Sequence, residues 1–240
     1  MASLLYISVR PERPAADAEY ASFRRGLGVG ALDRLDLLTE PLDAAALSAH
    51  RGIVIGGSPF NVTDPAPSDL QHRVEADLER IAETAIAGRT AALFTCYGIG
   101  VVTRMLGGTV SADHPEPASA ITIRTTAAAH SDPLFGPSGA ELTVLTAHKE
   151  AAAAVPETAV LLATGDACAV QAYRVGTHLY ATQFHPEPSP ADFVERMTFY
   201  RTMGYFAPEE FEDVQSRVLA ASVTEGAALL GRFARLASAR

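Results

Sequence analysis

The chain has 240 residues, of which 48% are hydrophobic and 20% charged, so it can bury a core and lacks the composition of a disordered protein. A formal net charge of −9 argues against a nucleic-acid-binding protein, because such proteins need basic surface to neutralise phosphates. No apolar run approaches the length of about 18 residues that a membrane span requires, so we expect no membrane partner. Two cysteines, Cys96 and Cys168, are too few for a secreted disulfide scaffold and favour a cytoplasmic protein.

Strands and helices alternate through the first half of the chain. Residues 4–9 are apolar and follow no basic leader, which predicts a buried first strand and not a signal peptide. Apolar residues at helical spacing predict a helix over residues 15–27, and the glycine-rich segment 26–30 is expected to end it in a loop. Further strands are expected over residues 32–38 and 52–55.

The next helix and strand lead to a cysteine. Residues 68–87 form an amphipathic helical pattern whose apolar face is made by Val74, Leu78, Ile81 and Ala85. A strand is expected over residues 91–95, and Cys96 follows it directly. Residues 97–106 are then expected to form a helix that ends at a glycine pair.

The second half of the chain is richer in strands and ends in helices. Strands are expected over residues 118–125, 141–147, 160–163, 169–174 and 179–184, and helices over residues 191–202, 208–221 and 224–237. The pattern predicts one doubly wound α/β domain over residues 1–190, built on a mostly parallel sheet. Residues 191–240 are expected to form a helical C-terminal extension packed on it.

A cysteine between a strand and a helix is well placed to act as a nucleophile. The tight turn exposes its side chain at the carboxyl edge of the sheet, and the next helix N-terminus supplies N–H groups that favour a thiolate and stabilise an oxyanion. The run Cys96-Tyr97-Gly98-Ile99-Gly100 fits this placement. A free thiol has a pKa of about 8.5, so an adjacent base is needed. Cys168 has no base nearby in the sequence, and we interpret it as structural.

The best candidate for that base is His185, which follows the predicted strand 179–184. Pro186 biases His185 toward an extended conformation, so Glu187, two residues on, lies on the same side and can hold the imidazole tautomer. Gly56-Gly57-Ser58-Pro59, after an earlier strand, offers a second backbone N–H for an oxyanion. The remaining histidines follow no metal-ligand spacing, so we expect neither a metal site nor a cofactor.

These motifs and two others occur in an order that resembles the class I, triad-type glutamine amidotransferases, especially stand-alone proteins similar to the glutaminase domain of GMP synthase. The order along the chain is Ile53-Val54-Ile55-Gly56-Gly57-Ser58-Pro59, Cys96-Tyr97-Gly98-Ile99-Gly100, Ala147-His148-Lys149-Glu150, Val170-Gln171-Ala172-Tyr173-Arg174-Val175-Gly176 and Gln183-Phe184-His185-Pro186-Glu187. The resemblance covers residues 4–188 and implies a flavodoxin-like fold.

The resemblance also implies a mechanism. Cys96 attacks the side-chain amide of glutamine, His185 accepts the thiol proton and passes it to ammonia, and Glu187 orients His185. The backbone N–H groups of Gly57 and Tyr97 hold the oxyanion, and water then cleaves the thioester. By the same resemblance, the residues that contact the substrate are Gly56, Ser58, Gly100 and His148.

Family members pass ammonia to a synthetase domain or subunit. This chain leaves no room for such a domain, so the resemblance implies a synthetase partner in trans, or a purely hydrolytic activity. A homodimer is a further interpretation. The C-terminal apolar residues either pack on the parent domain or form a partner surface; they are Tyr200, Met203, Tyr205, Phe206 and Phe211.

Two departures from the family pattern leave the substrate open. Phe94 stands where the family usually has glycine, two residues before the cysteine, and Gly100 stands where it often has glutamine. The loss of that glutamine keeps a γ-glutamyl hydrolase or peptidase as an alternative to a glutaminase. The helical extension keeps a third hypothesis, a non-catalytic regulatory subunit, which the intact Cys–His–Glu set disfavours. Turnover of glutamine compared with γ-glutamyl conjugates separates the first two.

Overall fold

The computed structural model describes residues 3–239. Its main strands are β1 (Leu4–Ser8), β2 (Asp33–Asp36), β3 (Gly52–Ile55), β4 (Ala91–Thr95), β6 (Glu116–Thr125), β7 (Glu141–His148), β9 (Ala159–Thr164), β10 (Ala172–Val175) and β11 (Leu179–Thr182). A small ribbon pairs β5 (Val110–Ser111) with β8 (Ala151–Ala152). The helices are α1 (Arg13–Leu27), α2 (Ala44–Ala49), α3 (Asp69–Ile86), α4 (Tyr97–Met105), α5 (Pro190–Phe199), α6 (Phe211–Ala220) and α7 (Glu225–Ser238), with 3-10 turns η1 (Ala127–Ser131) and η2 (Pro208–Glu210).

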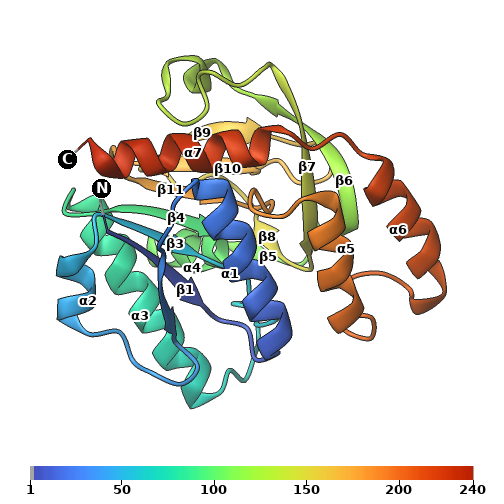
Figure 1. Ribbon diagram of the computed structural model, residues 1–240, viewed down its shortest axis with the longest axis horizontal. Coiled ribbons are helices and arrows are strands. Elements are labelled where there is room, and N and C mark those ends of the chain that lie inside the picture. Colours follow the sequence, from blue (N-terminus) through green and yellow to red (C-terminus); the bar gives the residue numbers. More distant parts are fainter. Residues whose placement is uncertain (1–2, 240) are drawn as a thin grey trace.

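The main strands form one sheet in the order β2-β1-β3-β4-β11-β10-β9-β6-β7 (Figure 1). Neighbours are parallel from β2 to β11 and antiparallel from β11 to β7. The predicted doubly wound α/β fold is therefore confirmed. Beyond β11, the sheet continues with four antiparallel strands, β10, β9, β6 and β7. Because β3, β4 and β11 are parallel neighbours, the segments that follow them meet at one edge of the sheet.

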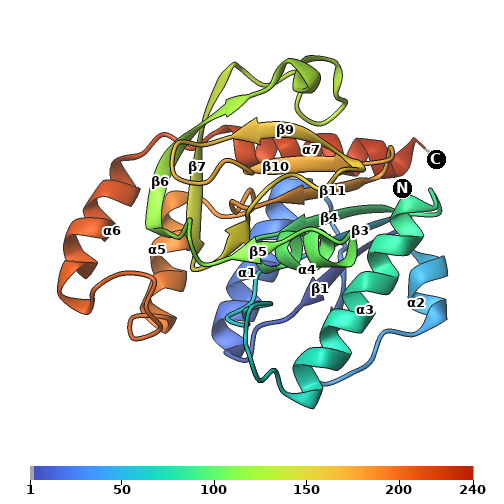
Figure 2. The same cartoon turned by 180° about the vertical axis from the view of Figure 1, so that it is seen from behind.

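Alternating side chains of the buried strands divide the core into two layers. On β1, Leu5 and Ile7 pack on the face covered by α3 and α4, whereas Leu4 and Tyr6 pack on the face covered by α1 and α7. The two views in Figures 1 and 2 show these helices on opposite sides of the sheet. The layers hold the sheet between helices, which fixes the positions of the strand ends.

Most predicted elements lie within a few residues of their expected bounds. The predicted apolar face of α3 is fully buried, and Ser68 caps this helix by accepting from the Gln71 N–H. The first helix ends at Leu27 as predicted, and Gly28 of the glycine-rich segment is its left-handed C-cap. Gly26, in the last turn of α1, lies close to α7: a Cβ there would be 2.5 Å from Leu230 Cδ1.

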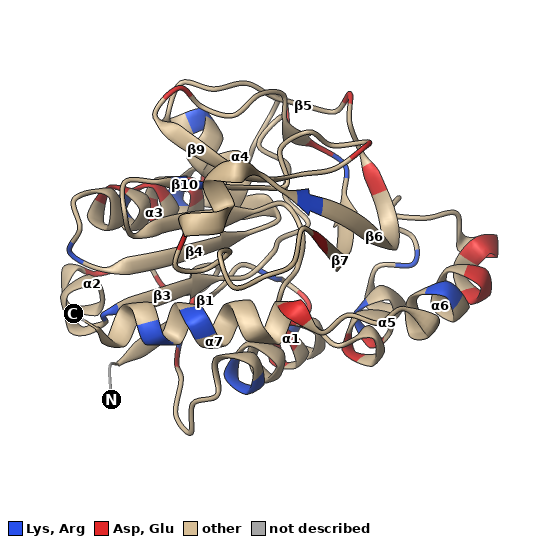
Figure 3. Cartoon of the chain, turned by 90° about the horizontal axis from the view of Figure 1, so that it is seen from above, with Lys and Arg blue, Asp and Glu red and all other residues tan. Residues whose placement is uncertain are grey.

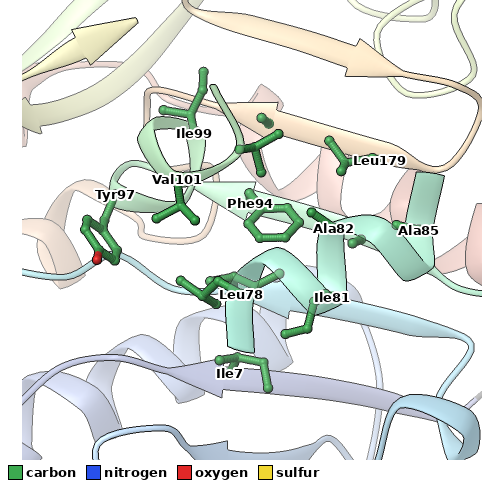
Figure 4. Packing of buried hydrophobic residues seen from close by; sticks show 14 of the residues in the cluster. Ile7, Leu78, Ile81, Ala82, Ala85, Phe94, Tyr97, Ile99, Val101 and Leu179 are labelled. Carbon is green, nitrogen blue, oxygen red and sulfur yellow. The ribbon is translucent and has the colours of Figure 1, made fainter. Parts of the chain in front are cut away.

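Phe94 lies at the centre of the core between β4 and helices α3 and α4 (Figure 4). Its ring is fully buried beside Ile81 and Ala82 of α3 and Val101 of α4. A Cβ on Gly98 would lie 3.0 Å from the Phe94 Cβ, so the glycine lets α4 approach the strand over this larger side chain. The core below the turn that carries Cys96 therefore accommodates Phe94, which stands where the family usually has glycine.

The last three helices lie against the sheet from two directions. Helix α7 packs on α1 and β3, with Leu229, Leu230 and Phe233 in the core layer of that face. Helices α5 and α6 cover β6 and β7 at the far end of the sheet (Figure 2). Of the predicted C-terminal apolar cluster, Tyr200, Phe206 and Phe211 are buried, Tyr205 is half-buried and Met203 is exposed. Residues of α5 and α7 pack in the same core clusters as the preceding strands. The division of the chain at residue 190 stays a prediction.

Acidic and basic residues are interspersed over the helices, and acidic ones gather at the start of α6, where Glu212 and Asp213 lie in the first turn (Figure 3). Negative charge at a helix N-terminus stabilises the helix. Among the described residues, none of the helices combines the length and the apolarity needed to cross a bilayer.

Candidate active site

Three neighbouring strands deliver the predicted residues to one edge of the sheet. Gly56, Gly57 and Ser58 follow β3, Cys96 follows β4, and His185 follows β11. The Cys96 N–H donates to the Thr182 carbonyl at 2.8 Å, and the His185 N–H donates to the Leu145 carbonyl at 2.8 Å. These main-chain bonds continue the sheet to its edge and fix the backbone of both residues.

Cys96 adopts a backbone conformation that L-residues rarely occupy. Its φ and ψ are 52° and −102°, and it is the only non-glycine with positive φ among residues 3–239. Such a conformation costs about 1–3 kcal/mol and persists only where surrounding structure imposes it. Here it joins the end of β4 to the start of α4 and directs the thiol toward the open edge. The residue is 9% exposed, so it lies at the border between the core and solvent.

His185 and Glu187 form a buried pair beside this thiol. The His185 Nδ1 and Glu187 Oε1 atoms are 3.0 Å apart, and both residues are 4% exposed. Burial alone would lower the pKa of His185, but the charge of Glu187, then that of Cys96, and hydrogen bonds to both raise it to about 9. The Glu187 pKa is lowered: burial opposes this, and the charges of His185 and Arg196 outweigh it. Both shifts favour the charged pair of imidazolium and carboxylate.

A buried charge network lies behind this pair. Glu19 Oε1 accepts from the Arg10 guanidinium at 2.8 Å and from Arg196 Nη1 at 3.3 Å, and Arg196 Nη1 also donates to Glu187 at 2.6 Å. Burial would raise the pKa of Glu19, but the charges of Arg10 and Arg196 hold it below its ordinary value. The Glu19, His185 and Glu187 ligand atoms lie within 4.8 Å of one another, an arrangement that would suit a metal ion. The two guanidiniums already neutralise these carboxylates, which makes the cluster an ion-pair network.

The network changes the role expected for Gly57. Its N–H donates to Glu19 Oε1 at 3.2 Å, so the predicted oxyanion donor already has a buried acceptor. The next residue, Ser58, is 5% exposed and borders Cys96, and its N–H has no hydrogen bond within the described chain. Gly57 instead supplies close approach, because a Cβ there would lie 2.7 Å from Arg10 Nη2 and 2.8 Å from His185 Cε1.

Gly56 has a similar packing role that predicts a stability effect. A Cβ at this position would lie 2.0 Å from Glu19 Oε2 and 2.7 Å from its Cδ. We therefore expect Gly56→Ala to lower the free energy of unfolding by at least about 1–3 kcal/mol, the usual cost of overpacking a buried site. Urea denaturation measures this change. Gly30→Ala is the matched control, since nothing lies within 4 Å of a Cβ there; equal stability of the two variants would contradict the placement of Glu19.

One recess borders Cys96 on the side of α4, and we call it the His148 recess. It is lined by Ser58, Tyr97, Gly100, His148, Lys149 and Glu150, together with Cys96. The His148 Nε2 atom bonds Glu116 Oε2 at 2.8 Å, while its buried Nδ1 has no partner in the described residues. A Cβ on Gly100 would lie 3.2 Å from Val62 Cγ2, so the loop after β3 occupies the space beside this glycine. The recess therefore brings together the predicted Ser58, Tyr97, Gly100 and His148.

A second hollow borders Cys96 on the side of α5, and we call it the His185 cavity. Its wall is largely apolar. Besides Cys96 and His185, its lining includes Ala118, Phe193, Arg196, Met197, Tyr205 and Phe206. Ser58, Ala147 and Tyr205 line both hollows, so the cavity and the recess meet at the cysteine. The thiol thus has access to two chemically different spaces.

Sequence reasoning missed the residues that support this arrangement. Glu19 and Arg196 are the main omissions, with Arg10 and Glu116. A signal for two of them exists: Glu19 lies on the face of α1 that carries Ala16 and Phe23, and Arg196 lies beside Phe193 and Met197 on α5. A charged residue on an otherwise apolar helix face indicates a buried partner. The partner's identity, however, depends on contacts between segments far apart in the chain.

Comparison with known proteins places this geometry in context. The family model named Glutamine amidotransferase class-I matches residues 26–203. Gamma-glutamyl peptidase 3 of Arabidopsis thaliana is 26% identical over 151 residues, covering 60% of this chain and 57% of that protein. The match therefore spans little more than half of that relative's length.

Two solved structures have a fold similar to that of this chain. A glutamine amidotransferase from Thermotoga maritima superposes with a TM-score of 0.75 at 16% identity, covering 98% of this chain and 96% of that one. A GMP synthase-type protein from Thermoplasma acidophilum gives a TM-score of 0.62 at 23% identity, covering 84% of this chain and 96% of that one. These likenesses extend over most of the described chain.

Proposed function

This chain belongs to the class I glutamine amidotransferase family, and from that premise we propose that Cys96 hydrolyses γ-glutamyl amides through a covalent thioester. The observation that supports this most directly is the strained Cys96 backbone beside the buried His185–Glu187 pair. A nucleophile, a proton carrier and a group that orients the carrier are the parts such chemistry needs.

The first half of the proposed reaction forms the thioester. The Cys96 thiolate attacks the γ-carbonyl carbon, and the N–H groups of Ser58 and Tyr97 stabilise the oxyanion, with Ser58 replacing the Gly57 of the sequence prediction. Because Nδ1 of His185 faces Glu187, its Nε2 carries the proton that the leaving nitrogen takes. The C–N bond then breaks, and the amine departs.

The second half regenerates the enzyme. His185, now neutral, takes a proton from water, and the hydroxide attacks the thioester carbonyl. The C–S bond breaks, glutamate leaves, and Cys96 is again a thiolate beside the His185 imidazolium. Glu187 keeps the imidazole in one tautomer throughout, while Arg196 and Arg10 balance the buried carboxylates.

Two substrate classes fit this chemistry. Glutamine is the simplest, and ammonia would then pass to a synthetase partner in trans. A γ-glutamyl conjugate is the second, and two observations favour it: the similarity to a γ-glutamyl peptidase and the apolar cavity beside His185. A cytoplasmic location fits either class, since both cysteines are free thiols. Homodimerisation also stays a prediction.

Selective alkylation tests the proposed nucleophile. We expect iodoacetamide at neutral pH to modify Cys96 and to leave Cys168 intact in the folded protein, with peptide mass spectrometry as the measurement. Cys96 lines two hollows, whereas burial raises the pKa of the Cys168 thiol to about 11 and its side chain is fully enclosed. Glutamine or a γ-glutamyl dipeptide should slow the labelling. Equal modification of both cysteines, or of Cys168 alone, would contradict the assignment.

A further inference from the structure

Among the residues in which the two hollows at Cys96 differ, His185 decides their roles. His185 lines the His185 cavity, whereas it is not among the residues that line the His148 recess. The proton donor must lie within about 2.6–3.2 Å of the nitrogen that departs. In the proposed reaction, the leaving group is therefore held in the His185 cavity, and the γ-glutamyl group is held in the His148 recess.

Most of the wall of the His185 cavity is apolar, and the remainder includes Arg10, Ser58, Arg196 and Tyr200. Phe193 and Met197 come from α5, Phe206 from the segment before α6, and Ala118 from β6, and all four side chains are less than 9% exposed. Ammonia gains nothing from such a wall, because it is small and strongly hydrated. An apolar side chain on the leaving group would lose its contact with water there and bind more tightly.

Arg196 lines the same cavity, and two of its buried nitrogens lack an acceptor within residues 3–239. Both nearby carboxylates, Glu19 and Glu187, accept from the single nitrogen Nη1 of Arg196. The Nε and Nη2 atoms of Arg196 are buried and have no acceptor among the described residues. A guanidinium offers its N–H groups in a planar fork that suits a carboxylate, and unsatisfied buried donors are costly. A ligand carboxylate would satisfy them.

Resting on the proposed thioester chemistry, we propose that the leaving group is an α-amino acid with an apolar side chain, so that the substrate is a γ-glutamyl dipeptide. Phe193, Met197 and Phe206 contact the side chain of the second residue, and Arg196 binds its carboxylate. Hydrolysis consumes one water, breaks the γ-amide C–N bond, and releases glutamate and the free amino acid. The acceptor of the first step is the Cys96 thiolate, so no further reactant is required.

Four substrates separate the parts of this proposal when kcat/KM is measured on the full chain by glutamate release. We expect γ-glutamyl-leucine to exceed γ-glutamyl-glycine and glutamine by at least about tenfold, the usual range for filling or emptying an apolar pocket. The 3-methylbutylamide of γ-glutamate has the leucine side chain without its carboxylate, and we expect it to be at least about tenfold slower than the dipeptide. Glutamine equal to or faster than the dipeptide overturns the apolar leaving-group site. An amide as fast as the dipeptide overturns the role of Arg196.

These outcomes are distinct from failure of the proposed function. If glutamine is hydrolysed without preference for the dipeptide, the thioester chemistry stands and only the leaving-group site is wrong. If the chain hydrolyses none of the four compounds, both proposals fail together.

Variants of the cavity wall give a second test. Met197→Ala should lower the ratio of kcat/KM for γ-glutamyl-leucine to that for glutamine by at least about fivefold, because it removes an apolar contact. Ala118→Leu should lower the same ratio by filling the cavity, and a general loss of folded protein would leave the ratio unchanged. Met203→Ala is the matched control, since Met203 is 39% exposed and belongs to the same region of the chain. A ratio that is unchanged in both cavity variants overturns the site.

Discussion

Replacing Cys96 with alanine is expected to lower kcat/KM for γ-glutamyl amides by at least about 10⁴-fold, the scale on which loss of a catalytic nucleophile acts. The other cysteine, Cys168, cannot take its place, because it lies between β9 and β10, is fully buried and lines neither hollow. Steady-state release of glutamate from glutamine and from a γ-glutamyl dipeptide measures the effect. Cys96→Ser should show a similar loss, because a hydroxyl ionises far less readily than a thiol.

The matched control for this variant is Cys168→Ala. It removes the same sulfur from the same chain but leaves the site intact, so we expect wild-type kcat/KM. Circular dichroism and thermal unfolding should show folded protein for both variants. Activity that survives Cys96→Ala in folded protein would exclude Cys96 as the nucleophile and would favour the non-catalytic, regulatory interpretation.

Glu187→Gln is expected to reduce kcat/KM by about 10²–10⁴-fold, as in other sites where the group that orients a histidine is neutralised. The glutamine can present its NH₂ group to Nδ1, which favours the tautomer with the proton on Nε2 and removes the base. It also deletes the largest favourable charge near His185, while Arg196 Nη1, 3.4 Å from Nδ1, remains. The imidazolium is thus opposed both by burial and by a neighbouring cation.

The sign of the accompanying pH effect follows from the raised pKa of His185. In the wild type, the imidazolium that protonates the leaving nitrogen is present at neutral pH and is lost as the pH rises through about 9. The alkaline limb of the kcat/KM profile should lie near this value. Without the negative charge of Glu187, the His185 pKa falls, so the alkaline limb of Glu187→Gln should move to lower pH. The groups that face His185 are Glu187, Cys96, Arg196, Glu19 and Arg10.

Glu195→Gln is the control for this experiment. Glu195 lies on α5, one residue before Arg196, and its side chain is exposed, so the substitution changes the same chemical group outside the buried network. Its pH profile should match the wild type. A Glu187→Gln profile that also matches the wild type would show that Glu187 does not set the protonation of His185.

The fold and the proposed nucleophile could be predicted because they depend on local patterns. Buried parallel strands are apolar throughout, and helices repeat their apolar residues at 3.6-residue spacing, so β3, β4, α3 and α4 were found within a few residues of their bounds. Cys96 directly between a strand and a helix, and Glu187 two residues after His185, are relations within one short segment. Residues this close in the chain keep nearly the same relative positions whatever the rest of the fold does.

The charge network illustrates what local patterns miss. Gly57 was predicted as an oxyanion donor because a glycine pair follows a strand, yet its N–H donates to Glu19, 38 residues away in the chain. Arg196 donates to Glu19, 177 positions away in the chain, and to Glu187, nine positions away. The sequence marks Glu19 and Arg196 as unusual on their helix faces, but only the packing of α1 and α5 at the sheet edge determines which groups they contact.

The sequence by itself determined that a thiol, an imidazole and a carboxylate lie at the edge of an α/β sheet, because each is tied to the end of a strand. Only the tertiary structure decided what surrounds them. The His185 cavity is assembled from β6, α5 and the segment before α6, and its largely apolar wall and Arg196 come from elements that meet nowhere in the sequence. Chemistry that depends on neighbours along the chain can be predicted from the sequence, whereas substrate selection depends on side chains that converge only when the core has packed.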